Sequence, residues 1–252
     1  MTVGKLLPPR VVDGLPGRVH RNDFMLWPAT VDSVGMYRDG AQRVIADIDQ
    51  ALHAVGRDFA DVDRWLDYGC GYGRVLRYLL MRVDASRVWA TAVLPEAVRF
   101  CEREFGVHPL LSVDELPELG AGRFDFVYAI SVITHLNPAA SVEFLRLMGN
   151  TVSDDGVVLF TTQGICTVEH LAHAGLTESV VQRRASIAEE LRTTGLSYVP
   201  YEYYRTNYGV TFHARDWVES AMRAAHGDLL KLVSYVPGAM PFAQDTFVFQ
   251  RS

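Results

Sequence analysis

The residues best suited to bind a ligand lie in one short segment, D-Y-G-C-G-Y-G at positions 67–73, which follows the apolar pair Trp65-Leu66. This order of residues indicates a buried strand, a glycine-rich turn and a helix start. Glycine adopts positive φ and has no Cβ, so the backbone of such a turn can approach a nucleotide-like ligand closely. The acid before the turn could meet a cationic or hydroxyl-bearing group, directly or through water. The predicted ligand contacts are Asp67, Gly69, Cys70, Gly71 and Gly73.

The spacing of the glycines disfavours NAD or FAD, because the third glycine of the dinucleotide fingerprint would stand where this chain has Arg74. The segment instead resembles motif I of class I S-adenosylmethionine (SAM)-dependent methyltransferases. Three later segments resemble the same family in the correct order: L-P-E-A-V at 94–98, S-V-D-E-L-P at 112–117 and F-D-F-V-Y-A-I-S-V-I-T-H-L at 124–136. The resemblance covers roughly residues 62–163. It implies SAM as cofactor and S-adenosylhomocysteine as product.

One position departs from the family pattern. The family usually ends its second strand with an acid that accepts hydrogen bonds from both ribose hydroxyls, whereas this chain has Ala92, followed by Val93. Losing hydrogen bonds to a charged group costs about 1.5–3 kcal/mol. Glu96 could substitute for the missing acid, or it could simply place a favourable charge at a helix N-terminus. The other cofactor contacts that the resemblance implies are Ser112, Val113, Asp114, Ile130 and Ser131.

Methyl transfer demands little of side chains beyond positioning, exclusion of water and, for hydroxyl acceptors, removal of a proton. His135 follows the fourth strand on the ligand side, and an imidazole is suited to accept that proton near neutral pH. Its alternative role is that of a loop histidine bonded to the backbone. No cluster has metal-ligand spacing, and G-x-S-x-G is absent. The residues predicted to contact substrate are Tyr201, Tyr204, Tyr208, His213 and Asp245.

Composition points to a small-molecule partner. The 252 residues are 49% hydrophobic and 21% charged, with a net charge of −6, and their positive residues form no block. Neither a nucleic-acid backbone nor a membrane is therefore an expected partner, and the start of the chain lacks the apolar region of a signal peptide. Three cysteines without C-x-x-C spacing suggest reduced thiols. We expect a cytoplasmic protein, and the sequence leaves the oligomeric state open, a homodimer included.

Strands and helices are expected to alternate along the chain. This order predicts an α/β fold: a Rossmann-like, doubly wound, mostly parallel sheet, seven-stranded with an antiparallel C-terminal hairpin, and with a helical and aromatic lid insertion. The expected strands are 64–68, 88–93, 110–113, 124–131, 156–162, 229–235 and 246–249, the last two joined through Pro237-Gly238. The expected helices are 36–55, 74–81, one from Pro95, 138–152, 167–173, 178–193 and 214–225.

The expected organisation has four parts. Residues 1–36 form an N-terminal arm, 37–163 the SAM-binding core, 164–213 the substrate lid, and 214–252 a helix and hairpin that complete the core. The lid ends in the segment 198–208, which has five tyrosines. That segment could line a pocket, or it could be a hydrogen-bonded β-hairpin or surface loop.

These observations favour methylation of an O or N atom of a small metabolite, such as a sugar or a secondary metabolite. Ala92 motivates one alternative, a methyltransferase fold repurposed for a non-methylating reaction such as cyclisation or rearrangement. A second alternative is a non-catalytic binding subunit. The retained acid and glycines at 67–73 argue against complete loss of ligand binding.

Overall fold

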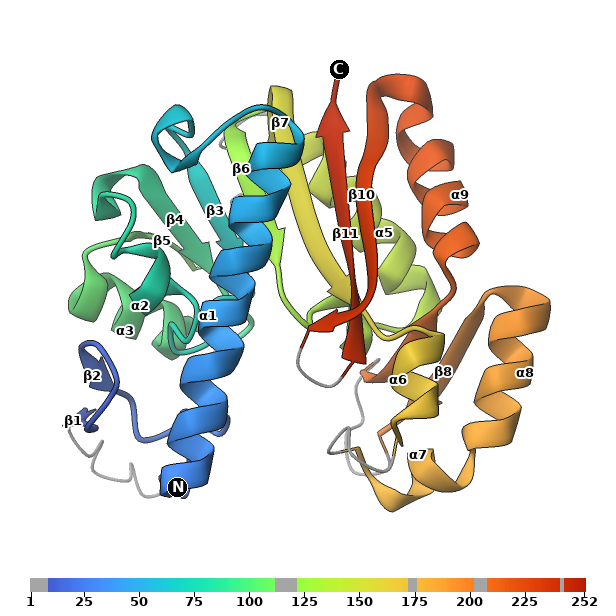
Figure 1. Ribbon diagram of the computed structural model, residues 1–252, viewed down its shortest axis with the longest axis horizontal. Coiled ribbons are helices and arrows are strands. Elements are labelled where there is room, and N and C mark those ends of the chain that lie inside the picture. The colour runs from blue at the N-terminus through green and yellow to red at the C-terminus, as the bar shows by residue number, and fades with distance from the viewer. Residues whose placement is uncertain (1–8, 112–121, 172–175, 202–207, 241–242) are drawn as a thin grey trace.

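A central seven-stranded sheet organises the chain, and helices cover both of its faces (Figure 1). The computed structural model describes residues 9–111, 122–171, 176–201, 208–240 and 243–252. The strand order is β10-β11-β7-β6-β3-β4-β5, in which β11 runs antiparallel to both of its neighbours, β10 and β7, and the other pairs are parallel. This architecture confirms the predicted fold class. The strands of this sheet are β3 (Trp65–Tyr68), β4 (Val88–Thr91), β5 (His108–Leu110), β6 (Phe124–Ala129), β7 (Val152–Thr162), β10 (Leu230–Met240) and β11 (Gln244–Arg251).

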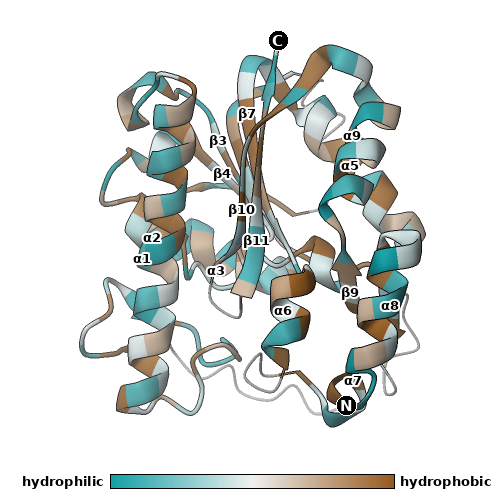
Figure 2. Cartoon of the chain, turned by 45° about the vertical axis from the view of Figure 1, so that its right-hand side comes forward, coloured by the Kyte–Doolittle hydropathy of each residue, from teal (hydrophilic) through white to brown (hydrophobic). Residues whose placement is uncertain are grey.

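Two hydrophobic clusters hold the layers together. Side chains alternate between the faces of a strand, so β3 sends Trp65 to one face and Leu66 to the other. The first face packs against the helices at the start of the chain, and the second against two later helices. Figure 2 shows hydrophobic residues along the central strands and hydrophilic residues alternating with them around the outer helices. The covering helices are α1 (Val31–Ala54), α2 (Leu76–Leu79) and α3 (Pro95–Phe105) on the first face, and α5 (Pro138–Thr151) and α9 (Arg215–His226) on the second.

The strand order reverses at β3, which has β4 on one side and β6 on the other. In open α/β sheets such a switch point opens a crevice beyond the carboxyl ends of the strands, where ligands bind. The loop after β3 and the short 3₁₀ helix η3 (Ile133–His135) after β6 both leave the sheet at this edge. The topology therefore brings the glycine segment and His135 to the same end of the molecule.

The N-terminal arm lies at that end, beside the glycine segment (Figure 1). It contains the strand pair β1 (Arg10–Val11) and β2 (Arg18–Val19). The His20 ring stacks on the Tyr72 ring, with 4.5 Å between centroids and 2° between planes. Buried Arg77 of α2 donates to the backbone carbonyls of Gly73 and Pro16. These contacts attach the arm to the segment that follows β3.

The described residues 165–171, 176–201 and 208–213 form a separate small layer at the same end of the sheet (Figure 1). Strands β8 and β9 of this layer form an antiparallel hairpin, which pairs Leu196 with His213 and Pro200 with Gly209. A hydrogen-bonded hairpin was one of the two alternatives for the tyrosine-rich segment. The layer has its own buried cluster, which includes Ile187 and Phe212. The elements of this layer are α6 (Ile165–Glu169), α7 (Glu178–Gln182), α8 (Arg184–Thr194), β8 (Leu196–Pro200) and β9 (Gly209–His213).

Several element boundaries differ from those expected, and three of the differences have a visible structural reason. Helix α1 begins at Val31 rather than at Met36, because Thr30 and Ser33 form a capping box there. Strand β7 begins at Val152 and passes through the expected turn at 153–156, with an irregularity in its pairing with β6. Strand β10 continues through Pro237-Gly238 to Met240, with register shifts that absorb the two turn-forming residues.

Candidate active site

The glycine loop after β3 has the backbone geometry of a ligand cradle. Gly69, Gly71 and Gly73 all have positive φ, at 95°, 52° and 79°. The N–H groups of Gly69 and Cys70 donate to the Thr91 carbonyl at 2.8 and 2.9 Å, which fastens the loop to the end of β4. The loop is thus held where two neighbouring strands end.

The three glycines serve different purposes. A Cβ on Gly69 would lie 2.5 Å from Val132 Cγ2, and one on Gly73 would lie 2.4 Å from Phe105 Cε2. A Cβ on Gly71 would meet no heavy atom of the described residues within 4 Å. The outer two glycines therefore permit internal packing, and Gly71 alone presents its backbone to open space.

This difference predicts opposite outcomes for two matched substitutions. We expect Gly71→Val to keep a cooperative fold, at a cost of about 1–2 kcal/mol for its left-handed backbone, and to abolish nucleoside binding by filling the cradle. Gly73→Val should instead lower the melting temperature more strongly, because its side chain meets Phe105. Thermal melts and calorimetric titration with S-adenosylhomocysteine check both. Unchanged binding by Gly71→Val would refute this position for the ligand.

Asp67 is a buried carboxyl group below this loop. It is 3% exposed, and no hydrogen-bond partner among the described residues reaches its Oδ2. Burial raises its pKa to about 7, against opposing effects of the neighbouring Tyr128 hydroxyl and of the positive charge of Arg74. A buried acid that lacks a bonded cation is suited to bind a positively charged ligand group.

The end of β4 presents apolar surface where an acid was expected. Ala92 is half-buried, and Val93 is 77% exposed. Glu96, in the first turn of α3, accepts hydrogen bonds at Oε1 from the Tyr72 hydroxyl at 2.5 Å and from Asn22 Nδ2 at 2.8 Å. These bonds lower the pKa of its carboxyl group. Glu96 thus links the glycine loop to the N-terminal arm, a role beyond that of a helix N-terminal charge.

The residues after β6 lie beside the glycine loop, since Val132 is the side chain that excludes a Cβ at Gly69. Ile130 is half-buried, and Ser131 has a positive φ of 59°. The Ser131 N–H donates to Thr161 Oγ1 at 2.8 Å, and its hydroxyl donates to Gln244 Oε1 at 2.9 Å. The predicted adenine contacts Ser112, Val113 and Asp114 lie outside the described residues.

His135 contacts the small layer formed by the described residues of 165–213, at the carboxyl edge of the sheet. Its Nδ1 is 2.7 Å from the Tyr201 hydroxyl. Burial lowers its pKa, against an opposing backbone hydrogen bond with Gly209, so the ring is neutral at pH 7. Tyr208 is bridged to Leu136, the residue after His135. The structure therefore brings together His135, Tyr201 and Tyr208, whereas Tyr204 lies outside the described residues.

His213 and Asp245 are held inside the protein. His213 is fully buried, with Nε2 3.3 Å from Ser141 Oγ and its ring against Trp217, and burial lowers its pKa to about 3. Asp245 is 1% exposed and accepts hydrogen bonds from the Tyr235 hydroxyl and the Gly238 N–H. Both side chains are therefore buried, and each has a hydrogen-bond partner within the protein.

The structure adds two aromatic residues that the sequence reasoning missed. Tyr128 is paired with Asp67 across β3 and β6, which places its hydroxyl beside the carboxyl group. Tyr68 ends β3 near Tyr208, and burial together with Tyr208 raises its pKa to about 12. The alternation of β3 could have indicated Tyr68, because a residue at the end of the central strand must reach the ligand edge.

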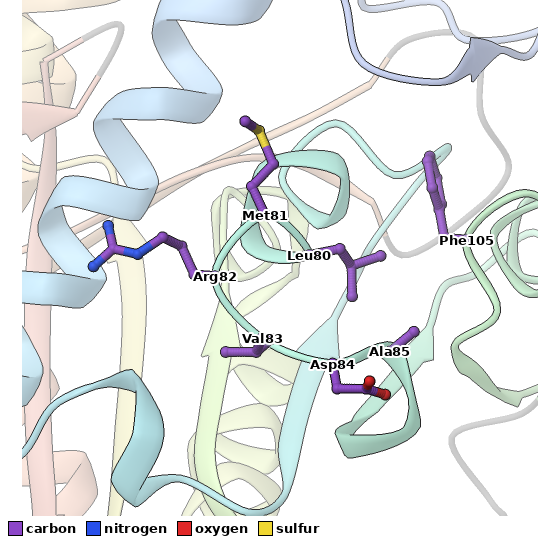
Figure 3. A pocket seen from close by; sticks show the side chains of 7 residues that line it. All are labelled: Leu80, Met81, Arg82, Val83, Asp84, Ala85 and Phe105. Atoms are coloured by element: carbon purple, nitrogen blue, oxygen red, sulfur yellow. The ribbon is translucent and has the colours of Figure 1, made fainter.

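A hollow of about 480 Å³ lies elsewhere, on the connection between α2 and β4 (Figure 3). It contains none of the predicted site residues, and its walls come from the connection between α2 and β4 and from the end of α3. Its lining residues are Leu80, Met81, Arg82, Val83, Asp84, Ala85 and Phe105. We do not assign ligand binding to it.

The described ranges of the chain offer neither a metal-binding cluster nor a helix that could span a membrane. No group of three His, Cys, Asp or Glu side chains is arranged there to hold a metal ion. None of the helices in that part of the chain combines the length and apolar composition that crossing a bilayer requires.

The sequence matches the methyltransferase domain family over residues 37–201. This match spans well over half of the chain, which therefore belongs to that family. Its sheet, with an antiparallel final pair, is that of the class I SAM-dependent methyltransferases. No functionally curated protein matches the sequence significantly.

Solved structures with a similar fold have low sequence identity. An O-methyltransferase family protein from Burkholderia thailandensis is 16% identical with a TM-score of 0.54; the match covers 88% of this chain and 59% of that protein, so this chain spans less than two thirds of its length. SAM-bound CalS10, an amino pentose methyltransferase from Micromonospora echinaspora, is 16% identical with a TM-score of 0.52, covering 86% and 92%. NodS, an N-methyltransferase from Bradyrhizobium japonicum in complex with S-adenosylhomocysteine, is 15% identical with a TM-score of 0.52, covering 88% and 93%.

Proposed function

We propose that this protein transfers the methyl group of SAM to an O or N atom of a small metabolite, such as a sugar or a secondary metabolite. The observation that carries the proposal is the buried carboxyl group of Asp67, whose Oδ2 has no hydrogen-bond partner among the described residues, below the open backbone of Gly71 at the switch point of the sheet. CalS10, an amino pentose methyltransferase, supports a small-molecule acceptor, and NodS, an N-methyltransferase, supports nitrogen as an acceptor atom.

The residues present fit SAM as the bound group. Asp67 offers a carboxylate to the ammonium of its amino-acid end, and the loop 69–73 offers open backbone at Gly71. The exposed side chain of Val93 and the half-buried Ile130 offer apolar contact to the adenine. When bound, SAM supplies an activated methyl carbon on a sulfonium, so the protein has to position the acceptor and exclude water.

His135 is the proposed base for a hydroxyl or ammonium acceptor. Its neutral ring is in the state that can take a proton, and its hydrogen bond with Tyr201 fixes its orientation. Tyr201 and Tyr208 belong to the segment that closes against η3, so the insertion 164–213 would act as the lid over the acceptor. The arm 1–36 would cover the cofactor side of the same edge.

The first experiment is calorimetric titration of the protein with SAM and S-adenosylhomocysteine, together with mass spectrometry for any co-purified nucleoside. Micromolar binding supports the proposal and justifies a screen of acceptors with SAM as donor. Absence of both binding and a retained nucleoside would contradict it. Binding without methyl transfer to any acceptor would favour the repurposed fold or a binding subunit.

Ala92 provides a gain-of-affinity test. If the ribose lies against the end of β4, Ala92→Asp restores a charged acceptor and should tighten S-adenosylhomocysteine binding by roughly tenfold or more, the value of one to two hydrogen bonds to a charged group. A matched Ala92→Asn variant, which adds similar volume without charge, should gain less. Equal affinity in all three proteins would mean that the nucleoside lies differently.

A further inference from the structure

Ser131 is held in a strained backbone conformation at the carboxyl end of β6. Its φ of 59° lies in the left-handed region, where any residue with a Cβ is strained. Glycine occupies this region freely, as Gly69 does in the neighbouring loop. A strained residue persists only where its surroundings impose the conformation, and such residues cluster at functional sites. The contacts that impose this conformation on Ser131 therefore indicate its role.

Every polar group of Ser131 has a buried partner. Its N–H donates to Thr161 Oγ1 at 2.8 Å, and its hydroxyl donates to Gln244 Oε1 at 2.9 Å. Its carbonyl accepts a hydrogen bond from the Thr134 hydroxyl at 2.8 Å. These partners belong to β7, β11 and η3 respectively. Because Gln244 is 113 residues away in sequence, the assembled sheet imposes this turn, and the local sequence alone does not.

The turn at Ser131 directs the segment that follows it. The His135 N–H donates to the carbonyl of Val132, the residue after Ser131, at 3.1 Å. The 3₁₀ helix η3 and its histidine therefore start from this turn. On the far side of η3, Leu136 is bridged to Tyr208 of the small layer. His135 is thus held between the Ser131 turn on one side and that layer on the other.

We propose that Ser131 is a positioning residue for His135, and that the buried amide of Gln244 holds it in this role. This inference rests on the proposed function, because His135 is the base of that proposal. Without the bond to Gln244 the turn relaxes toward negative φ, and the His135 ring leaves its place beside the Tyr201 hydroxyl. The glycine loop keeps a separate attachment, since its own N–H groups donate to the end of β4. Ser131 therefore acts on the placement of the base and not on cofactor affinity.

Alanine and glycine at position 131 separate this role from a contact between the hydroxyl and a ligand. Both substitutions remove the hydroxyl, but only glycine adopts the left-handed backbone without strain. We expect Ser131→Ala to lower turnover by about 5- to 30-fold, the factor that corresponds to such strain, and Ser131→Gly to lower it several-fold less. Gln244→Met, which removes the acceptor oxygen and keeps a similar volume, should resemble Ser131→Ala. Turnover is measured with the acceptor found by the screen with SAM, and calorimetry should give S-adenosylhomocysteine affinities close to the native value.

An NMR titration of the histidine rings gives a second readout that needs no acceptor. Because burial lowers the pKa of His135, this pKa reports whether the ring keeps its place. In Ser131→Ala and Gln244→Met the pKa of His135 should rise toward the ordinary value of a histidine, whereas in Ser131→Gly it should stay lowered. The His135→Ala variant assigns the signal. Gln250→Met removes an amide from the opposite end of β11 and is the matched control, which should change neither turnover nor the pKa of His135.

Each other outcome decides the matter. Equal losses of turnover in Ser131→Ala and Ser131→Gly would show that the hydroxyl acts directly on a ligand, which overturns the inference. Native turnover in Ser131→Ala, or an unmoved His135 pKa in both Ser131→Ala and Gln244→Met, would overturn it as well. If no acceptor is methylated, the proposed function fails, and the NMR titration alone still decides whether Ser131 places His135. If Ser131→Ala does not fold, Gln244→Met carries the same test.

Discussion

Asp67→Asn is expected to make the ligand-free protein more stable at pH 8 and to abolish its binding of S-adenosylhomocysteine. The pKa of Asp67 is raised from 3.8 to about 7, chiefly by burial. The folded state therefore binds more protons than the unfolded state between these values, so stability falls as pH rises through this window. About three pKa units correspond to an upper bound of about 4 kcal/mol. Asparagine has nearly the same shape and no charge to bury.

Chemical denaturation and thermal melts at pH 4 and pH 8 check the effect. The variant should gain about 2 kcal/mol or more at pH 8, or several degrees in melting temperature, and little at pH 4, where the native carboxyl group is protonated. Asp84→Asn is the control, because Asp84 is fully exposed and bonds to Ser86, which lowers its pKa. It should show no such stabilisation. A loss of stability by Asp67→Asn at pH 8 would reveal a countercharge that the described residues do not provide.

This trade between stability and binding is typical of functional sites. The buried carboxylate destabilises the ligand-free protein, and a cationic ligand group offsets this destabilisation when it binds. Both oxygens of the buried acid Asp245 accept hydrogen bonds, from Tyr235 and Gly238, whereas Oδ2 of Asp67 has no donor among the described residues. The contrast between these two buried acids supports a ligand role for Asp67.

The order of elements could be predicted because it rests on local patterns. The strand Trp65–Tyr68, the proline-started helix at Pro95 and the helix from Pro138 follow from apolar runs and from capping chemistry. The start of α1 was misplaced because its first turns, from Val31, cover the arm rather than the sheet and so lack the apolar period used to find it. The Pro237-Gly238 pair suggests a turn that joins two strands, but it lies in a register shift within β10, between Val236 and Met240, where Gly238 has a positive φ.

The site was less predictable than the fold, because its contacts join distant segments. Nothing in the tyrosine-rich segment indicated that Tyr201 would bond to His135, 66 residues earlier. The link between Asn22 of the arm and Glu96 is equally remote in sequence, at 74 residues. The packing reasons for Gly69 and Gly73 depend on Val132 and Phe105, which no spacing rule connects to them. Motifs thus located the residues, and tertiary packing decided which of them face a ligand.

His135→Ala is expected to lower methyl transfer by roughly 10²–10⁴ while leaving S-adenosylhomocysteine affinity unchanged. A positioned general base contributes a factor of this size, and His135 lies with the insertion rather than with the glycine loop. Turnover is measured with the acceptor found by screening, and affinity by calorimetry. His53→Ala, at an exposed histidine of α1, should change neither. Full activity in His135→Ala would leave His135 a structural role only.

The pH dependence of turnover and a variant of Tyr201 distinguish a catalytic role of His135 from a purely structural one. Because burial lowers the pKa of His135, the neutral ring persists below pH 6.5, and turnover should fall only as pH drops through that lowered value. Tyr201→Phe removes the hydrogen bond at His135 Nδ1. It should therefore reduce turnover and alter its pH dependence without weakening the binding of the cofactor. Residues that act as a unit are non-additive, so the double variant should be no slower than His135→Ala. Additive losses would show that Tyr201 contacts the acceptor independently and that the base does not depend on its hydrogen bond.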